Sequence, residues 1–230
     1  MTGWVFDLDD TLYLERDYVA SGFRAVARAI AVAGTMPEDD VYTFLRSGFE
    51  AGVRGRAFDR LRDESTAVAR RFETSDLVEV YRVHEPSIRP LPGAVALLDR
   101  ATAAGVPLAL VTDGEPEGQG RKLTALGLDA RFSPAVRTGT WGRAYWKPHP
   151  RAFETVEAEW RARGADLVYV ADNPAKDFVE PRRRGWRTVR LRLDGQLHAA
   201  AEASTPAHAA EHVVHSVDAL AAWLERTIDE

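Results

Sequence analysis

The sequence predicts an α/β protein in which helices cover a parallel sheet and an all-helical block is inserted near the start. From about residue 94 onwards, short apolar runs alternate with helical patterns, which is typical of parallel sheets covered on both faces. Another apolar run, residues 4–6, stands alone at the start of the chain and needs partner strands, so we expect it to join this sheet. Between these parts, residues 18–84 show helical periodicity and no strand pattern.

The helical block follows a short connector, residues 12–16, and its apolar residues recur at helix spacing. Gly34 ends the first helix, and Pro37 opens a second helix with acidic residues in its first turn, where they complement the helix dipole. Further helical patterns lead to a proline-punctuated connector, residues 85–93, which ends the block. We therefore expect an α/β core formed by residues 1–14 and 88–230 and a helical domain formed by residues 15–87.

The core elements alternate along the rest of the chain. A glycine follows three of the helical patterns, at Gly105, Gly127 and Gly185, which is a common signal for a helix C-terminus. Apolar runs between the helical patterns supply the strands. We expect helices at residues 94–104, 119–126 and 150–163 and between Asp177 and Gly185, and strands at 107–111, 135–136, 167–171 and 186–191.

The composition of the chain excludes several kinds of site and partner. The formal net charge of the 230 residues is only −5, whereas nucleic-acid-binding proteins normally carry a strongly basic face, so we expect no nucleic-acid partner. The absence of cysteine excludes disulfides, thiolate zinc sites and a cysteine nucleophile. Because no apolar run could span a bilayer and no leader pattern precedes the first strand, we expect a soluble cytoplasmic protein without a membrane partner.

The first expected strand is followed at once by the sequence Asp7-Leu8-Asp9-Asp10-Thr11. Ligands of open α/β sheets gather at the carboxyl ends of strands, so these acids stand where a site would lie. Two anions as close as Asp7 and Asp9 are costly to place together unless a cation joins them, which indicates Mg²⁺. The alternative from this stretch alone is that Asp9 and Asp10 cap the next helix, with Thr11 completing a turn.

Further polar groups stand at the ends of the other expected elements. They are Thr112-Asp113-Gly114 after the strand 107–111, Asp172 and Asp177 after the strand 167–171, and Lys147 beside Pro148 ahead of a helix. Together with Asp7 and Asp9 they provide carboxylates, a hydroxyl and an ammonium group. These are the parts that phosphoryl transfer needs, because its barrier falls through positioning and charge neutralisation.

These motifs resemble, in order, the four motifs of the haloacid dehalogenase-like (HAD) hydrolase superfamily. The opening DLDDT matches the first motif, DxDxT, and Thr112 matches the second. Lys147 within WKPHP matches the third, and Asp172 with Asp177 within ADNPAKD matches the fourth. Four motifs in the right order are a specific signal, whereas any one alone is weak. The resemblance extends from residue 4 to about residue 193 and implies a Rossmann-like core with the helical block as a C1-type cap.

The resemblance assigns different roles to the two acids of the first motif. Asp7 resembles the nucleophile that forms an aspartyl-phosphate, and Asp9 resembles the general acid/base that protonates the leaving oxygen and later activates water. The resemblance also implies Mg²⁺ held by the Asp7 side chain, the Asp9 backbone carbonyl and Asp172. Asp9 favours a phosphatase over a dehalogenase, because an alkoxide leaving group needs a proton and a halide does not.

The resemblance also assigns roles at the phosphate to the other motif residues. The Thr112 hydroxyl and the backbone amides of Asp113 and Gly114 would bind phosphate oxygens. Lys147 would offset the developing charge, and Asp177 would orient Lys147 or a metal-bound water. Asp113 departs from the family pattern, in which asparagine is common, and its added negative charge near the phosphate could alter the choice of substrate.

From these parts we expect a Mg²⁺-dependent phosphomonoesterase that hydrolyses a small phosphorylated metabolite, such as a sugar phosphate or a nucleotide-like ester. The alternatives are a phosphomutase or 2-haloacid dehalogenase of the same fold, or a regulatory protein that binds phosphate without turnover. Tyr13 and Arg16 follow the nucleophile, where caps of this family meet substrate, and are candidate substrate contacts. The sequence leaves open the substrate, the oligomeric state, and the roles of the aromatic stretch 141–146 and of the histidine-containing segment near the C-terminus.

Overall fold

The computed structural model describes residues 2–228 of the chain, which divides into two compact units. The α/β unit comprises Met1–Arg16 and Arg89–Glu230, and the helical unit comprises Asp17–Ile88. The expected fold class, a parallel α/β sheet with an inserted helical block, is confirmed. Within residues 2–228, no helix combines the length and the apolar character that crossing a bilayer would require.

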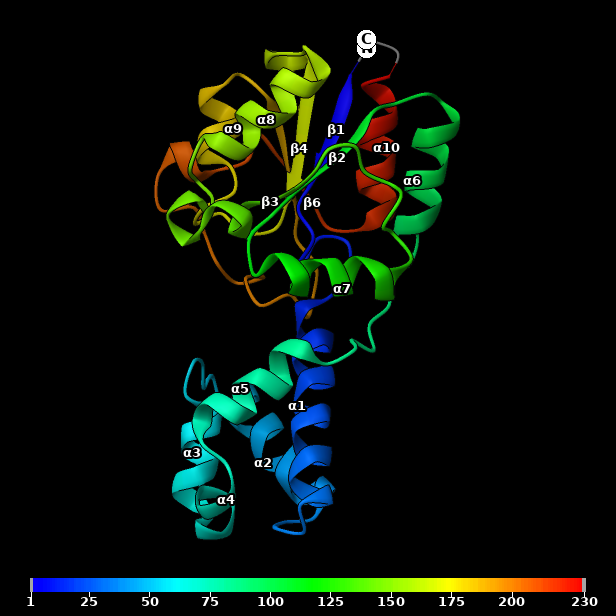
Figure 1. Cartoon of the computed structure of the whole chain (residues 1–230). Coiled ribbons are helices and arrows are strands. Elements are labelled where there is room, and N and C mark those ends of the chain that lie inside the picture. Colours follow the sequence, from blue (N-terminus) through cyan, green and yellow to red (C-terminus); the bar gives the residue numbers. More distant parts are fainter. Residues whose placement is uncertain (1, 229–230) are drawn as a thin grey trace. The chain divides into compact units, whose positions relative to one another are not determined.

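The sheet of the α/β unit has the strand order β3-β2-β1-β4-β5-β6, and all neighbouring strands are parallel (Figure 1). The strands are β1 (Gly3–Phe6), β2 (Leu108–Thr112), β3 (Ala135–Arg137), β4 (Leu167–Ala171), β5 (Arg187–Leu191) and β6 (His212–Val214). The chain order switches at β1, which pairs with β2 on one side and β4 on the other. The carboxyl ends of these three strands therefore meet at one edge, the usual place for a ligand in such sheets.

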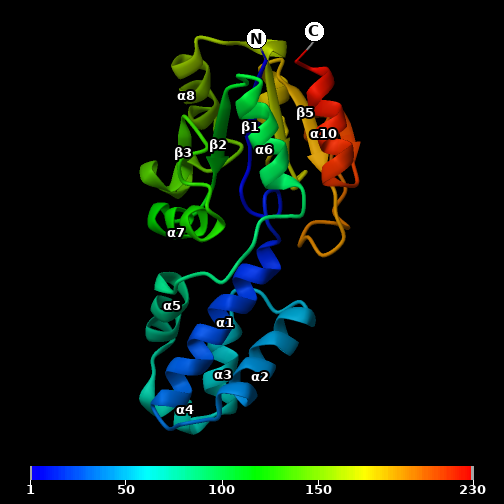
Figure 2. The same cartoon turned by 90° about the vertical axis from the view of Figure 1, so that its right-hand side faces the viewer.

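Four helices cover the two faces of this sheet, with α6 (Ala94–Ala103) and α10 (Val217–Arg226) on one side and α8 (Arg151–Trp160) and α9 (Val179–Arg183) on the other (Figure 1). Figure 2 shows α6 in front of the strands. Successive side chains of β1 point to opposite faces of the sheet, because side chains alternate along a strand. Trp4 donates a hydrogen bond to Thr227 Oγ1 at 3.1 Å, just after α10, whereas Val5 belongs to the core cluster that contains Phe153 of α8.

Helix α7 (Pro116–Leu126) follows β2 and lies at the carboxyl edge of the sheet (Figures 1 and 2). It begins three residues earlier than the sequence pattern predicted, with Pro116 in its first turn. Backbone amides in the first turn have no partner within the helix, so the missing amide hydrogen of a proline is tolerated there. It ends at Gly127 as expected, and the φ of +68° at this glycine is the left-handed conformation typical of a helix C-terminus.

The aromatic stretch 141–146 forms two short 3₁₀ turns, η1 (Thr138–Trp141) and η2 (Arg143–Tyr145). Trp141 packs against the core cluster that contains Phe153 of α8. The Arg151 guanidinium lies 4.5 Å from the centre of the Trp141 ring and 4.9 Å from that of Tyr145. The stretch therefore serves in part as core packing. Two further 3₁₀ turns, η3 (Gly164–Asp166) and η4 (Pro206–His208), lie in connections.

The helical unit contains most of α1 (Glu15–Val32), then α2 (Glu38–Glu50), α3 (Ala57–Glu64), α4 (Thr66–Arg71) and α5 (Thr74–Val83), and residues 17–88 include no strand. Its core combines buried aliphatic side chains with a cluster of aromatic rings. The Phe23 ring lies 6.2 Å from the rings of Phe49 and Phe58 and 6.0 Å from that of Tyr81. Helix α4 begins after Ser65, whose hydroxyl accepts a hydrogen bond from the Val68 amide, a standard N-terminal cap.

Candidate active site

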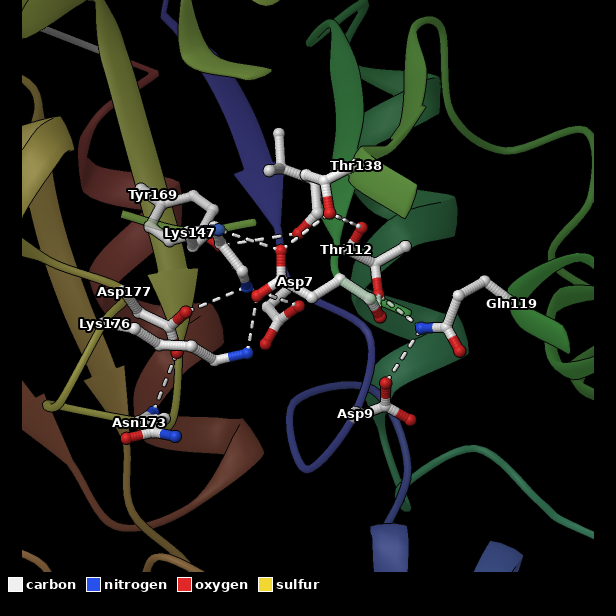
Figure 3. Close-up of polar contacts among 12 residues, drawn as sticks. Asp7, Asp9, Thr112, Gln119, Thr138, Lys147, Tyr169, Asn173, Lys176 and Asp177 are labelled. Carbon is white, nitrogen blue, oxygen red and sulfur yellow. Dashed lines mark hydrogen bonds and ion pairs between the residues drawn. The ribbon is translucent and has the colours of Figure 1, made fainter. Parts of the chain in front are cut away.

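Polar side chains converge at the carboxyl ends of β1, β2 and β4 (Figure 3). Asp7 directly follows β1, Thr112 is the last residue of β2, and Asp172 directly follows β4. All three are buried, with exposed fractions of 4% or less. The order of the strands thus brings together residues that are more than 160 positions apart in the chain.

Lys147 occupies the centre of this group. Its ammonium nitrogen lies 2.8 Å from Asp7 Oδ1 and 2.8 Å from Asp177 Oδ1, and it donates to the Tyr169 hydroxyl at 3.0 Å. Burial would lower the pKa of Lys147, but the carboxylates of Asp177 and Asp7 outweigh it and raise this pKa well above its ordinary value. Lys147 therefore stays positively charged beside Asp7. Asp177 is fixed on its other side, because Oδ2 accepts a hydrogen bond from the Asn173 amide at 2.9 Å.

The carboxylates of Asp7, Asp172 and Asp177 form a cluster in which ligand oxygens lie within 4.8 Å of one another. Burial raises the pKa of Asp7 to about 7 despite the opposing charge of Lys147, and burial together with Asp177 raises that of Asp172. Among the residues described, Asp172 Oδ2 is a buried oxygen without a hydrogen-bond partner. A buried cluster with excess negative charge and an unsatisfied oxygen fits a hard divalent cation such as Mg²⁺.

Asp9 lies apart from that cluster, and its carboxylate turns towards α7. Lys122 Nζ lies 2.6 Å from Oδ1, and Gln119 Nε2 donates to Oδ2 at 2.8 Å. The Tyr13 hydroxyl is a third donor, also to Oδ1. Burial would raise the pKa of Asp9, but the charge of Lys122 and the three hydrogen bonds outweigh burial and hold this pKa below its ordinary value.

The loop after β2 supplies a hydroxyl and a glycine at the same edge. Thr112 Oγ1 accepts a hydrogen bond from Gln119 Nε2 at 2.5 Å, so this one amide group bridges Thr112 and Asp9 (Figure 3). Gly114 has a φ of +125°, which favours glycine, and a Cβ there would lie 3.2 Å from the Gln119 side chain. A Cβ on Gly139 would lie only 2.0 Å from the Gly114 carbonyl oxygen, so the two loops are in close backbone contact.

Asp113 does not carry an uncompensated charge. Its Oδ1 accepts hydrogen bonds from Thr138 Oγ1 at 2.8 Å and from the Lys147 amide at 3.0 Å, and its Oδ2 lies 2.7 Å from Lys176 Nζ. Burial would raise the pKa of Asp113, but the two lysines hold it below its ordinary value. The negative charge that the sequence suggested near the phosphate site is therefore balanced by Lys176, and the side chain of Asp113 fixes the loop that presents Lys147.

Residues of β5 and of the segment after it support the site from the C-terminal side. Arg190 donates to the Asp172 carbonyl oxygen at 2.8 Å, and Gln196 donates to the Asp10 carbonyl oxygen at 2.6 Å. Asp10 adopts a φ of +53°, and its carboxylate accepts hydrogen bonds from the amides of Leu197 at 2.6 Å and Glu15 at 2.7 Å. The helix-capping alternative for the opening acids thus holds for Asp10, at the start of α1, whereas Asp9 faces α7.

The two candidate substrate contacts lie in different surroundings. Tyr13 is fully buried and contacts Asp9. Arg16 is partly exposed and lies near the glycine turn after β5, where a Cβ on Gly195 would come within 3.2 Å of Arg16 Nη1.

Several polar residues of this site were missing from the sequence interpretation. They are Gln119, Lys122, Thr138, Tyr169 and Lys176. Gln119 and Lys122 did leave a signal, because they are three positions apart on the helix face that also carries Leu123 and Leu126, which are buried. Polar residues on the apolar face of a helix generally need buried partners. No comparable signal marks Tyr169, which stands among the apolar residues of β4.

Residues 1–178 match the family model described as haloacid dehalogenase-like hydrolase. The chain belongs to this family. It is 27% identical over 196 residues to the glyceraldehyde 3-phosphate phosphatase of Methanocaldococcus jannaschii, covering 82% of this chain and 84% of that protein. It is 31% identical over 175 residues to hexitol phosphatase A of Escherichia coli, covering 75% of each chain. The family and these relatives indicate a phosphoric monoester hydrolase.

Solved structures of the haloacid dehalogenase-like family share the fold. The HAD hydrolase YfnB of Bacillus subtilis, bound to magnesium, aligns with a TM-score of 0.67 at 18% identity and covers 97% of this chain and 98% of its own. The L-2-haloacid dehalogenase of Xanthobacter autotrophicus aligns with a TM-score of 0.60 at 19% identity, and the alignment covers 98% of this chain and 99% of the dehalogenase chain. At these identities the likeness concerns the fold alone, so the chemistry must be argued from the residues.

Proposed function

We propose that this protein is a Mg²⁺-dependent phosphomonoesterase that hydrolyses a small phosphorylated metabolite through an aspartyl-phosphate intermediate. The observation that carries the proposal is the separation of the two acids of the DLDDT motif. Asp7 faces Lys147 and the carboxylate cluster, whereas Asp9 faces donors from α7. Each acid thus has partners of its own, which fits separate roles for the two: Asp7, beside Lys147 and the carboxylate cluster, as the nucleophile, and Asp9, held by its own donors, as the acid and base.

In the first step, an ionised Asp7 carboxylate oxygen attacks phosphorus, the bond from phosphorus to the ester oxygen breaks, and Asp9 gives that oxygen a proton. Because its donors favour the ionised form, Asp9 must take up this proton when the negatively charged substrate binds. In the second step, the ionised Asp9 takes a proton from water, the water oxygen attacks phosphorus, and the bond to Asp7 breaks to release inorganic phosphate. Lys147, 2.8 Å from Asp7 Oδ1, offsets negative charge at the reacting oxygens throughout. Thr112 Oγ1 and the amides of the loop after β2 bind the phosphate oxygens.

A metal is part of this proposal. Asp7 and Asp172, with the backbone carbonyl of Asp9, would hold Mg²⁺, and Asp177 would support the site through Lys147. When bound, the ion supplies positive charge shared between the carboxylates and the phosphate. The unsatisfied Asp172 Oδ2 and the raised pKa of Asp7 support a cation at this position.

The substrate class rests on the relatives. Their names specify glyceraldehyde 3-phosphate, a hexitol phosphate and, for a Thermus thermophilus protein 37% identical over 98 residues, phosphoserine. We extend from these to small phosphate esters of polyols, sugars or amino acids, with residues 15–87 as the cap. A dehalogenase would have no need for the donor-bound Asp9, because a halide leaves without a proton. A cytoplasmic location and the lack of nucleic-acid or membrane partners remain predictions from composition.

The test is inorganic phosphate release from a panel of sugar, polyol, amino-acid and nucleoside monophosphates, with Mg²⁺ or with chelator. We expect release that needs Mg²⁺ and that Asp7→Asn abolishes, while Asp63→Asn, which neutralises an exposed acid of the helical unit, has no effect. Acid-quenched enzyme should carry hydroxylamine-labile phosphate only when Asp7 is present. If no ester is hydrolysed by folded, Mg²⁺-supplied protein, or if a 2-haloacid is turned over instead, the proposal is wrong.

A further inference from the structure

Helix α7 places two polar side chains against Asp9. Lys122 Nζ lies 2.6 Å from Asp9 Oδ1, and Gln119 Nε2 lies 2.8 Å from Asp9 Oδ2. Both side chains come from the buried face of α7, with exposed fractions of 7% and 3% for the two residues. Together with the Tyr13 hydroxyl they form a set of three donors around one carboxylate, here called the Asp9 cradle.

The cradle is also tied to the phosphate loop. The amide nitrogen of Gln119 carries two hydrogens, and its two acceptors are Asp9 Oδ2 at 2.8 Å and Thr112 Oγ1 at 2.5 Å. One rigid amide group therefore fixes how far the Asp9 carboxylate lies from the hydroxyl at the end of β2. Figure 3 shows Gln119 between these two residues.

Burying an ammonium and an amide beside Leu123 and Leu126 is costly unless they are paired, and apolar residues would dock α7 on the sheet at least as well. Their position against Asp9 thus calls for a role beyond packing. We infer that Lys122 and Gln119 are positioning residues that hold the Asp9 carboxylate where it can reach the leaving oxygen. This inference rests on the proposed phosphatase activity. It adds α7 to the catalytic apparatus, which the four sequence motifs do not include.

The inference predicts a dependence on the leaving group. The value of kcat/KM covers every step up to departure of the alcohol, so a misplaced Asp9 lowers it only where the departing oxygen needs a proton. A displacement of about 1 Å in a catalytic group can cost roughly 10²-fold in rate. We expect Lys122→Met and Gln119→Leu to lower kcat/KM for an alkyl phosphate by about 10²-fold, and for p-nitrophenyl phosphate, whose phenolate leaves readily, by less than about fivefold.

The control is Arg121→Met, which removes a cation from the position directly before Lys122 on α7. Arg121 lies 3.9 Å from Glu117, and its side chain is more exposed than that of Lys122. Its kinetics should match those of the wild type on both substrates. In the Asp9→Asn background, Lys122→Met should add little further loss on the alkyl phosphate, because the two changes remove one function. Lys122→Arg, which keeps the cation, should retain more alkyl phosphatase activity than Lys122→Met. If Lys122→Met does not fold, the comparison of Lys122→Arg and Gln119→Asn on the two substrates takes its place.

Three results would overturn the inference while leaving the proposed function standing. They are an equal loss on both substrates, no loss on either, and a gain in alkyl phosphatase activity, which would mean that the cradle withholds Asp9 from the reaction. A wild-type protein that hydrolyses neither substrate would instead contradict the proposed function itself. The two failures are therefore separable in one set of assays.

Discussion

The buried charge of Asp7 gives the metal-free protein an unusual dependence of stability on pH. Burial and Asp177 raise the pKa of Asp7 from 3.8 to about 7, while Lys147 and Lys176 lower it only in part. The folded protein therefore holds this proton more tightly than the unfolded chain does. As a result, the contribution of Asp7 to the free energy of unfolding falls as pH rises from about 4 to about 7 and then levels off, opposite to the usual behaviour of a carboxylate.

The size of the effect follows from the shift. Each pKa unit corresponds to 1.36 kcal/mol, so the Asp7 shift amounts to roughly 4 kcal/mol of stability lost by pH 8. Asp7→Asn removes the charge and keeps a similar shape, and Lys147 keeps Asp177 at 2.8 Å. We expect metal-free Asp7→Asn to be more stable than the metal-free wild type at pH 8, by up to about 4 kcal/mol, and the difference to shrink towards zero near pH 4.

Urea unfolding followed by tryptophan fluorescence measures this effect, because Trp4 and Trp186 are almost fully buried in the α/β unit. The series covers pH 4.5 to 8 in chelator, with Asp63→Asn as a control at an exposed position. Adding Mg²⁺ at pH 8 should stabilise the wild type more than Asp7→Asn, by about 2.7 kcal/mol at a concentration one hundred times Kd. If the stability difference between metal-free Asp7→Asn and metal-free wild type is the same at pH 8 as at pH 5, or Asp7→Asn is the less stable protein at pH 8, the electrostatic reasoning is refuted.

Three further changes test individual parts of the site. Lys147→Met leaves the buried carboxylates of Asp7 and Asp177 without their cation. Urea unfolding at pH 8 should therefore show a free energy of unfolding lower by about 3 to 5 kcal/mol, and phosphate release should be lost. Unchanged stability would contradict the central position of Lys147. Asp113→Asn keeps an oxygen for Thr138 but loses its lysine partner, and thermal unfolding should show a loss of about 1 to 3 kcal/mol, with wild-type stability as the contrary result. Gly139→Ala would place a methyl group 2.0 Å from a carbonyl oxygen of the phosphate loop, so KM should rise several-fold, whereas Gly118→Ala, which meets only one atom at 3.9 Å, should leave KM unchanged.

The sheet could be predicted because of where its strands lie. Strands β1, β2 and β4 are wholly buried, and each leaves an almost continuous apolar run in the sequence, whereas β5 is largely buried but includes two arginines and a threonine. Strand β6 left no such signal, because it has three residues, of which His212 and Val213 are exposed. Its position at the sheet edge depends on pairing with β5, a contact that short-range patterns do not encode.

The candidate site was predictable to the extent that its residues follow strands. The positions of Asp7, Thr112 and Asp172 follow from strand ends, because parallel strands deliver their next residues to one edge. Gln119 and Lys122 were missed as partners of Asp9 because they come from a helix, and the face that a helix turns to a site depends on its rotation against the sheet. The balance of the Asp113 charge by Lys176 was missed for a similar reason, since two loops meet there only in the folded chain.

The contacts made by Arg190, Gln196 and Leu197 bear on how long a working enzyme must be. The family match ends at residue 178 and includes every motif residue. Three hydrogen-bond donors from residues 190–197 nevertheless hold loops of the site: one donates to the Asp172 carbonyl oxygen and two donate to Asp10. A polypeptide cut at residue 178 would keep all the reactive groups and lose the hydrogen bonds that hold two of their loops. The candidate reactive groups of this protein thus lie within residues 1–178, whereas hydrogen bonds that hold their loops in place come from residues 190–197.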